Sequence, residues 1–363
     1  MSEFFPSRTV TLYMAKLFLT RSLAVLALLV LVLQALDLLG ESEKILAHPG
    51  NGQAQILEYI SLRMPGIIQR FLPFSVLLGT LIAFMQLNQN SEVIAMKAAG
   101  LSAHQVLAPF IVASMVVAVV AFVFNERIVT RATSALSKWE AVEFGPVPDA
   151  RGGVTNVWVR DGDDLIHADV AAGRGSGTRL TGVAVYVRNG GVLKTVLTAD
   201  NARPVEGGWE LTNVRSFDVA TGKATVAPIL RAAKDVRPDQ FTLASVDPFG
   251  LSFGALSQAI NDLDAAGRPT AALKANLWHK ISGPLSTVLM PLLAAVAAFG
   301  LARSGKLFVR AVAGMALGFA YFVADNFGLA MGNLGAYPAL LAAWGPFILF
   351  LALGEAVLVR TEE

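Results

Sequence analysis

The stretch LFLTRSLAVLALLVLVLQALDLL, residues 17–39, decides the class of fold. It is longer than the roughly 20 apolar residues that a helix needs to cross a bilayer, and its only charges are Arg21 and Asp37 near its ends. It is also too long for the core of a signal peptide, and no convincing small-x-small cleavage site accompanies it. We therefore expect a membrane-spanning helix that stays in the protein.

Apolar stretches of similar length recur along the chain. Of its 363 residues, 54% are hydrophobic and 15% are charged, and the mean hydropathy is +0.56. A soluble domain carries about 25% charged residues. The sequence therefore predicts an α-helical membrane protein with six spans, arranged three and three around a long gap, at residues 17–39, 65–87, 106–124, 281–302, 307–331 and 339–359.

The short connections give the expected orientation, because Lys and Arg are enriched on the cytoplasmic side. The N-terminal segment carries Arg8, Lys16 and Arg21, and the 303–310 connection is also basic, whereas residues 332–338 hold no basic residue. We expect the N-terminus, residues 88–105, residues 303–310 and the C-terminus to be cytoplasmic. The region between the third and fourth spans is then expected outside the membrane, on the side opposite the cytoplasm.

That middle region has a different pattern. Residues 154–160, 164–171, 180–188, 192–200 and 208–219 alternate apolar and polar side chains, and turn sequences such as RNGG and ATGK separate them. This spacing predicts an antiparallel sandwich or jelly roll. We expect four parts: spans one to three in 1–126, a β-jelly-roll domain in 127–250, a helical connector in 251–277, and spans four to six in 278–363.

The sequence NSEVIAMKAAG, residues 90–100, lies in the short connection between the second and third spans. Asn90 or Ser91 can accept a backbone N–H at the start of a helix, and Gly100 can close its end. The stretch therefore predicts a short, capped helix on the cytoplasmic side.

Charges within this short helix follow the helix dipole. Glu92 lies in the first turn and Lys97 in the last. On one face of the helix lie Val93, Met96, Lys97 and Gly100. A capped helix of this kind transmits displacement, whereas a flexible loop would absorb it, and a passive interfacial linker is the plainer alternative.

Basic residues converge near the expected outer surface of the membrane. Arg127 and Arg131 are four residues apart and share a helix face. Each such residue alone is typical of the flank of a span. Together they predict a ring that holds anionic head groups through charge-assisted hydrogen bonds, formed by Arg63, Arg70, Arg127, Arg131, Lys138, Lys274 and Lys280.

Two charges lie inside the predicted spans. Arg70 and Asp325 project to a similar depth, less than about 10 Å from the outer surface at about 1.5 Å per residue. A charge in the bilayer requires a partner or a purpose. The two residues predict either a structural ion pair or contact with a polar substrate or a partner's helix.

Other chemistry is not indicated. The stretch GLARSGK, residues 300–306, resembles a phosphate-binding loop, but Leu307 occupies the position of the magnesium-binding hydroxyl and no strand precedes it. The chain has no cysteine, its four histidines show no ligand spacing, and a net charge of +2 does not indicate nucleic-acid binding. We expect no enzyme activity, no metal site and no cofactor in this chain.

Several stretches together resemble the LptF/LptG permeases of lipopolysaccharide export. They are NSEVIAMKAAGLS (90–102), TADNARP (198–204) with WELTNV (209–214), and NLWHKISGPLSTVLMPLLA (276–294). The opening YMAKLFLTRS with LDLLGE (36–41) is more similar to the LptG branch than to the LptF branch. The resemblance covers essentially the whole chain and implies three spans, an external β-domain and three more spans.

The resemblance further implies a role and partners. It implies an inner-membrane permease that pairs with LptF, sits on two LptB ATPase subunits that bind ATP and magnesium, and associates with LptC to extract lipopolysaccharide. Residues 90–100 match the coupling helix that docks on the ATPase, and Glu92 matches its acidic residue. The expected coupling residues are therefore Glu92, Val93, Met96 and Lys97. Basic residues at the outer ends of spans one to three would meet the lipid phosphates, and by position the candidates are Arg63, Arg70, Arg127 and Arg131, with Lys44 as a weaker one.

Three alternatives remain open from the sequence. The chain could be an LptF-type paralogue in the same complex. It could be a secondary transporter in which Arg70 and Asp325 form an ion relay, although no inverted repeat is evident. It could also be a membrane scaffold that displays a β-domain, although six spans exceed what an anchor requires.

Overall fold

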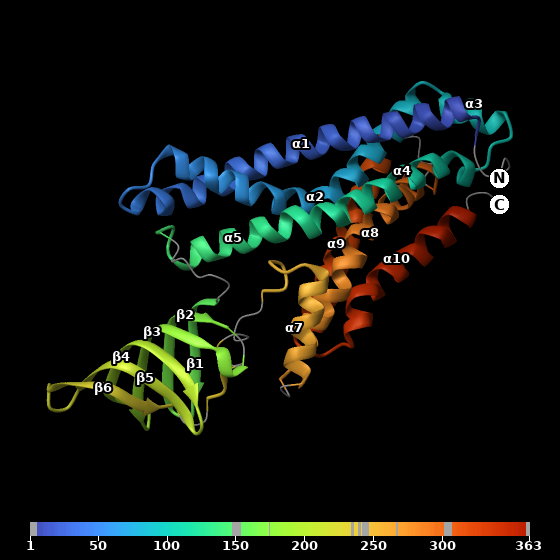
Figure 1. Ribbon diagram of the computed structural model, residues 1–363. Helices are drawn as coiled ribbons and strands as arrows, with labels where there is room; N and C mark the ends of the chain where they lie inside the picture. The colour runs from blue at the N-terminus through green and yellow to red at the C-terminus, as the bar shows by residue number, and fades with distance from the viewer. Residues whose placement is uncertain are drawn as a thin grey trace. The chain divides into compact units, whose positions relative to one another are not determined.

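The computed structural model describes residues 6–146, 154–173, 175–233, 236–238, 241, 247–265, 268–300 and 307–360. They divide into two compact units (Figure 1). The first contains Met1–Leu136, Pro248–Asp264 and Pro269–Glu363, and the second contains Ser137–Asp247 with Ala265–Arg268. The first is helical, whereas the second is built on a β-sheet.

Six helices of the first unit are long and apolar enough to cross a membrane, which confirms the six predicted spans. The first helix is 40 residues long, about 60 Å at 1.5 Å per residue, and so exceeds the hydrocarbon core of about 30 Å. The spans lie in α1 (Arg8–Ala47), α2 (Gln53–Gln89), α4 (Ala103–Phe124), α8 (Ala271–Gly300), α9 (Leu307–Asn333) and α10 (Ala339–Arg360).

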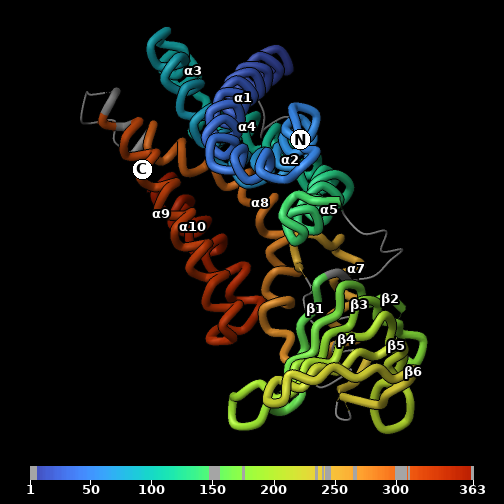
Figure 2. Tube along the Cα trace, turned by 90° about the vertical axis from the view of Figure 1, so that its left-hand side faces the viewer, coloured from blue at the N-terminus to red at the C-terminus, as the bar shows by residue number. Residues whose placement is uncertain are grey.

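Helix α8 is the centre of this unit. It packs against α2 and α4 on one side and α9 and α10 on the other (Figure 2), and it is the most buried of the six. Helix α1 packs along α2 and is exposed over most of its length. Close contacts use small residues, as in many membrane helix pairs: a Cβ at Gly79 of α2 would lie 2.4 Å from the Ser22 Oγ of α1.

Helix α4 ends at Phe124, where the sequence predicts the end of the third span, but the helical chain goes on beyond it. Helix α4 continues through a π-helical turn, Asn125–Val129, into α5 (Thr130–Ala141). A π turn accommodates an extra residue without breaking the helix. The boundary expected at 126–127 therefore falls inside continuous helix, and the two units divide at Leu136 and Ser137 instead.

The second unit contains one six-stranded antiparallel sheet, in the order β1-β2-β3-β4-β5-β6. Its core lies on one face, where Trp209 is 2% exposed and donates its indole N–H to the Val236 carbonyl at 2.8 Å. The strands are β1 (Val154–Asp161), β2 (Asp164–Ala172), β3 (Arg179–Asn189), β4 (Val192–Val205), β5 (Gly208–Asp218) and β6 (Ala224–Ala232).

The antiparallel, period-two prediction is confirmed for β1 to β5. Strand β6 was missed because its sequence, ATVAPILRA, contains Pro228, and a proline is tolerated at the edge of a sheet. Neighbouring strands follow one another in the chain, so the connectivity is that of a meander rather than the Greek-key crossing of a strict jelly roll. Beyond the sheet, α7 (Phe253–Ala265) forms in the expected helical connector.

Candidate functional site

The short helix predicted between the second and third spans is present as α3 (Glu92–Ala98). It lies at the end of the helical unit where α1 begins and α10 ends (Figure 1). In a protein with six membrane crossings, both termini and the connection after the second span must lie on the same side of the membrane. The arrangement is therefore consistent with six crossings.

The start of α3 differs from the prediction. Ser91 has a left-handed backbone, with φ of 59°, and its side chain makes no capping hydrogen bond. Asn90 does not cap the helix either: its amide donates to the Glu92 Oε1 at 3.1 Å. The predicted side-chain cap is therefore wrong, and the two polar residues instead shape the turn that leads into the helix.

The end of α3 is as predicted. Gly100 has φ of 86°, a conformation that glycine adopts without strain. Its N–H donates to the Lys97 carbonyl at 3.0 Å, and the Leu101 N–H donates to the Met96 carbonyl at 3.1 Å, which is the Schellman pattern. This motif fixes the chain direction as it leaves α3.

A second cap follows immediately. The Ser102 Oγ accepts the Gln105 N–H at 3.2 Å, and the Gln105 Oε1 accepts the Ser102 N–H at 2.9 Å. This reciprocal pair is a capping box at the start of α4. The connection from α3 to the third span is thus short and is hydrogen-bonded at both ends.

The expected coupling residues of α3, Glu92, Val93, Met96 and Lys97, have different surroundings. Val93 is only 4% exposed, and Met96 packs against the same core of the helical unit. Both anchor α3 to its own chain, so Val93 does not present a surface to a partner. Lys97 is exposed, and so is Ile94, which is 66% exposed and was missed by the sequence reasoning. Val93 and Ile94 are adjacent apolar residues, and the spacing in the sequence does not show which of them faces the helical core.

Glu92 is held by residues from two other segments. The Tyr13 hydroxyl of α1 donates to the Glu92 Oε1 at 3.2 Å, and the Asn90 amide donates to the same oxygen. Two turns further along α1, the Arg21 guanidinium donates to the Gln86 Oε1 at 2.7 Å. The first span is therefore tied by polar contacts to both sides of the turn that begins α3.

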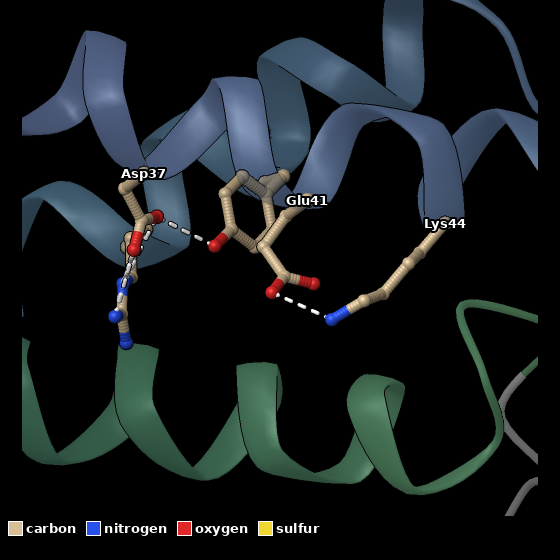
Figure 3. A network of polar contacts seen from close by, with 5 residues as sticks. Asp37, Glu41 and Lys44 are labelled. Carbon is tan, nitrogen blue, oxygen red and sulfur yellow. Dashed lines mark hydrogen bonds and ion pairs between the residues drawn. The ribbon is translucent and has the colours of Figure 1, made fainter.

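At the opposite end of α1, two predicted anion ligands have carboxylate partners. Asp37 accepts from Arg63 at 2.9 Å and from the Tyr59 hydroxyl at 2.6 Å. Figure 3 shows Asp37 near Glu41, which forms an ion pair with Lys44 at 2.8 Å. The charges of Arg63 and Lys44 are therefore compensated within the chain, which weakens their candidacy as ligands of a lipid phosphate.

The remaining predicted anion ligands are exposed. Arg70 lies on α2, Arg127 in the π turn and Arg131 in the first turn of α5. Within the described residues none of the three forms an ion pair. Their guanidinium groups are consequently available to an external anion, and Arg127 and Arg131 lie on one continuous helix.

The π turn also contacts the return of the chain. The Glu126 Oε2 accepts the backbone N–H of Phe253, the first residue of α7, at 2.8 Å. A carboxylate at a helix N-terminus is favoured by the unpaired N–H groups there. Glu126 therefore joins the end of the third span to the segment that re-enters the helical unit.

The predicted pair between Arg70 and Asp325 is not formed. Asp325 on α9 lies 3.0 Å from the Nε2 of His279 on α8, and both side chains are mostly buried. Asp325 pairs with His279 because α8 and α9 are neighbouring helices. The prediction compared only how deep Arg70 and Asp325 lie in the membrane, and equal depth does not show which helices face one another. His279 was not considered because isolated histidines carried no ligand spacing.

Metal and nucleotide chemistry gain no support from the described part of the chain. It contains no group of three or more His, Asp or Glu side chains positioned to hold a metal ion. The loop-like sequence at 300–306 lies, after Gly300, outside the described residues.

Six apolar spans, a β-domain inserted after the third, and a short helix in the second connection together define a polytopic membrane protein with a large inserted domain. The family model for the lipopolysaccharide export system permease LptF/LptG matches residues 12–360. The chain therefore belongs to the LptF/LptG family.

Individual relatives agree with this assignment. The chain is 26% identical to the lipopolysaccharide export system permease protein LptG of Escherichia coli K12 over 312 residues, which cover 83% of this chain and 84% of that protein. It is 25% identical to the LptG protein of Haemophilus influenzae over 317 residues, or 85% and 87% of the two chains. The similarity extends through spans and β-domain alike.

Proposed function

We propose that this chain is the LptG-type permease subunit of an ATP-driven exporter that extracts lipopolysaccharide from the inner membrane of a Gram-negative bacterium. Membership of the family and two relatives named LptG support this proposal. The subunit itself would hydrolyse no ATP. The energy would come from two copies of an LptB-type ATPase bound on the cytoplasmic side, with an LptF-type subunit and LptC as further partners.

The exposed surface of α3 is the observation that carries the mechanism. In this proposal the N-terminus, α3 and the C-terminus are cytoplasmic and the β-domain is periplasmic. The ATPase docks on Glu92, Ile94 and Lys97, while Val93 and Met96 keep α3 attached to its own bundle. A movement of the ATPase is then passed through the capped connection at 99–102 to the third span.

The basic ligands of the lipid are proposed at Arg70, Arg127 and Arg131. All three are exposed and lack carboxylate partners among the described residues. Lipid phosphates accept charge-assisted hydrogen bonds from such guanidinium groups, while the acyl chains stay in contact with apolar helix surface. Closure of the ATPase would narrow the apolar space and expel the lipid.

The test is a charge reversal in a reconstituted system. The Glu92→Lys chain is purified with its ATPase and second permease, and both ATP hydrolysis and lipopolysaccharide release from proteoliposomes are measured. We expect release to fall at least about tenfold, because a like charge against a basic partner costs several kcal/mol.

The matched control is Glu43→Lys, the same charge change at an exposed position near the other end of α1. It should leave release unchanged. Normal release by the Glu92→Lys chain, or lipid release by the purified chain with no ATPase present, would refute the proposed coupling.

A further inference from the structure

Tyr13 contacts Glu92 although 79 positions separate the two residues in the sequence. Tyr13 lies in the second turn of α1, and its hydroxyl donates to the Glu92 Oε1 at 3.2 Å. Asn90 donates to the same oxygen at 3.1 Å. Two donors from different segments therefore converge on one atom of the carboxylate.

The other carboxylate oxygen has no such partner. Within the described part of the chain, no donor lies within hydrogen-bond distance of the Glu92 Oε2. An ionised carboxylate accepts several hydrogen bonds on its two oxygens. Fixing Oε1 restricts the side-chain rotation and leaves Oε2 as the acceptor for an external cation. A guanidinium or ammonium group is the partner that this oxygen suits best.

The contact is separate from the packing that holds α1 in the bundle. Met14 and Phe18 are fully buried on the inward side of the helix, whereas Tyr13 is 44% exposed. Loss of the Tyr13 hydroxyl removes a polar link without opening a cavity. The hydroxyl is therefore not required to bury α1.

We infer that Tyr13 is a positioning residue, which orients Glu92 toward a basic side chain of the docked ATPase and links the displacement of α3 to the first span. This inference rests on the proposed function, because it assigns a second residue to the same coupling contact. The Arg21–Gln86 contact adds a second polar tie between α1 and the end of α2. Movement at Glu92 thus reaches span one through Tyr13 as well as span three through the capped connection.

The experiment is a double-mutant cycle on the assembled exporter in proteoliposomes. The measured quantity is the lipid released per ATP hydrolysed. Tyr13→Phe in an otherwise native chain should lower this ratio about three- to tenfold, since a hydrogen bond to a charged group is lost but the Asn90 donor remains. The amount of complex and its melting temperature should not change. Tyr337→Phe, at another exposed tyrosine, is the matched control and should have no effect.

The second arm repeats the change in a Glu92→Ala chain. Tyr13→Phe should cause no further loss there, because the atom that Tyr13 holds is absent. Equal losses in both backgrounds, or no loss in the native background while Glu92→Ala is impaired, would overturn the inference alone. Full release by Glu92→Ala would instead remove the proposed coupling role and the inference with it.

Discussion

His279 on α8 and Asp325 on α9 face one another inside the helical unit, with 3.0 Å between the Nε2 and Oδ2 atoms. Their side chains are 24% and 15% exposed. This polar pair joins the central helix α8 to α9 within a largely apolar bundle. The pair contributes to stability only when both side chains are present, since a single unpaired polar group in a membrane span is costly.

We expect His279→Leu to destabilise the protein by about 1–3 kcal/mol, because Asp325 is left without its partner. His279→Leu combined with Asp325→Leu should recover much of the loss, because no uncompensated polar group remains. The melting temperature of the detergent-purified chain is the measurement. A double variant that is less stable by the sum of the two single changes would contradict the pairing.

The contact between Ser22 and Gly79 predicts a strong size limit at the α1–α2 interface. A Cβ at Gly79 would lie 2.5 Å from the Ser22 Cα, a backbone atom that cannot move aside alone. Gly79→Ala should therefore destabilise the protein by about 1–3 kcal/mol. Gly66→Ala on the same helix, where nothing lies within 4 Å, should be neutral or slightly stabilising. Equal melting temperatures for the two variants would disprove this packing.

The basic residues at the outer ends of the first spans separate into two groups. Arg63→Gln should lower the melting temperature, because Asp37 loses a charged partner, with a cost of about 1–2 kcal/mol for this partly exposed pair. Arg127→Gln with Arg131→Gln should leave the melting temperature unchanged and reduce photo-crosslinking to lipopolysaccharide from a probe at position 70. Undiminished crosslinking would show that these two arginines are not ligands.

Asp264 gives a pH prediction. Hydrogen bonds from the Lys274 ammonium and the Thr270 hydroxyl hold the pKa of Asp264 below its usual value. A lowered pKa contributes stability above the unfolded value near 4, and this contribution is lost as the pH falls through the folded pKa. Native and Asp264→Asn chains should therefore differ in melting temperature at pH 7 and converge below about pH 4. A difference that persists in acid would exclude this cause.

The parts of the fold that the sequence predicts are those set by local pattern. Apolar length fixes the six spans, period-two alternation fixes β1 to β5, and Gly100 fixes the end of α3. Each depends on residues close together in the chain. The π turn at Asn125–Val129 leaves no such pattern, because its sequence is compatible with an ordinary helix.

The candidate site was predicted less completely, because its contacts join distant segments. Glu92 was identified, but its partner Tyr13 belongs to another helix, and no pattern in the sequence links these two residues. Arg63 and Asp37 were each noticed near a membrane surface without any sign that they are paired. Such contacts depend on how distant helices pack against one another, and this packing cannot be derived from the pattern of a single sequence.

The hydrogen bond from Phe253 to Glu126 brings the departure and return points of the long middle segment to one spot on the helical unit. Domain insertion is tolerated where the two ends of the inserted domain lie close together, because the path of the surrounding chain is then unchanged. The two ends of the inserted segment are therefore close enough to be bridged. By the same logic, a short linker that bridges the junction should yield a bare six-helix protein that still inserts.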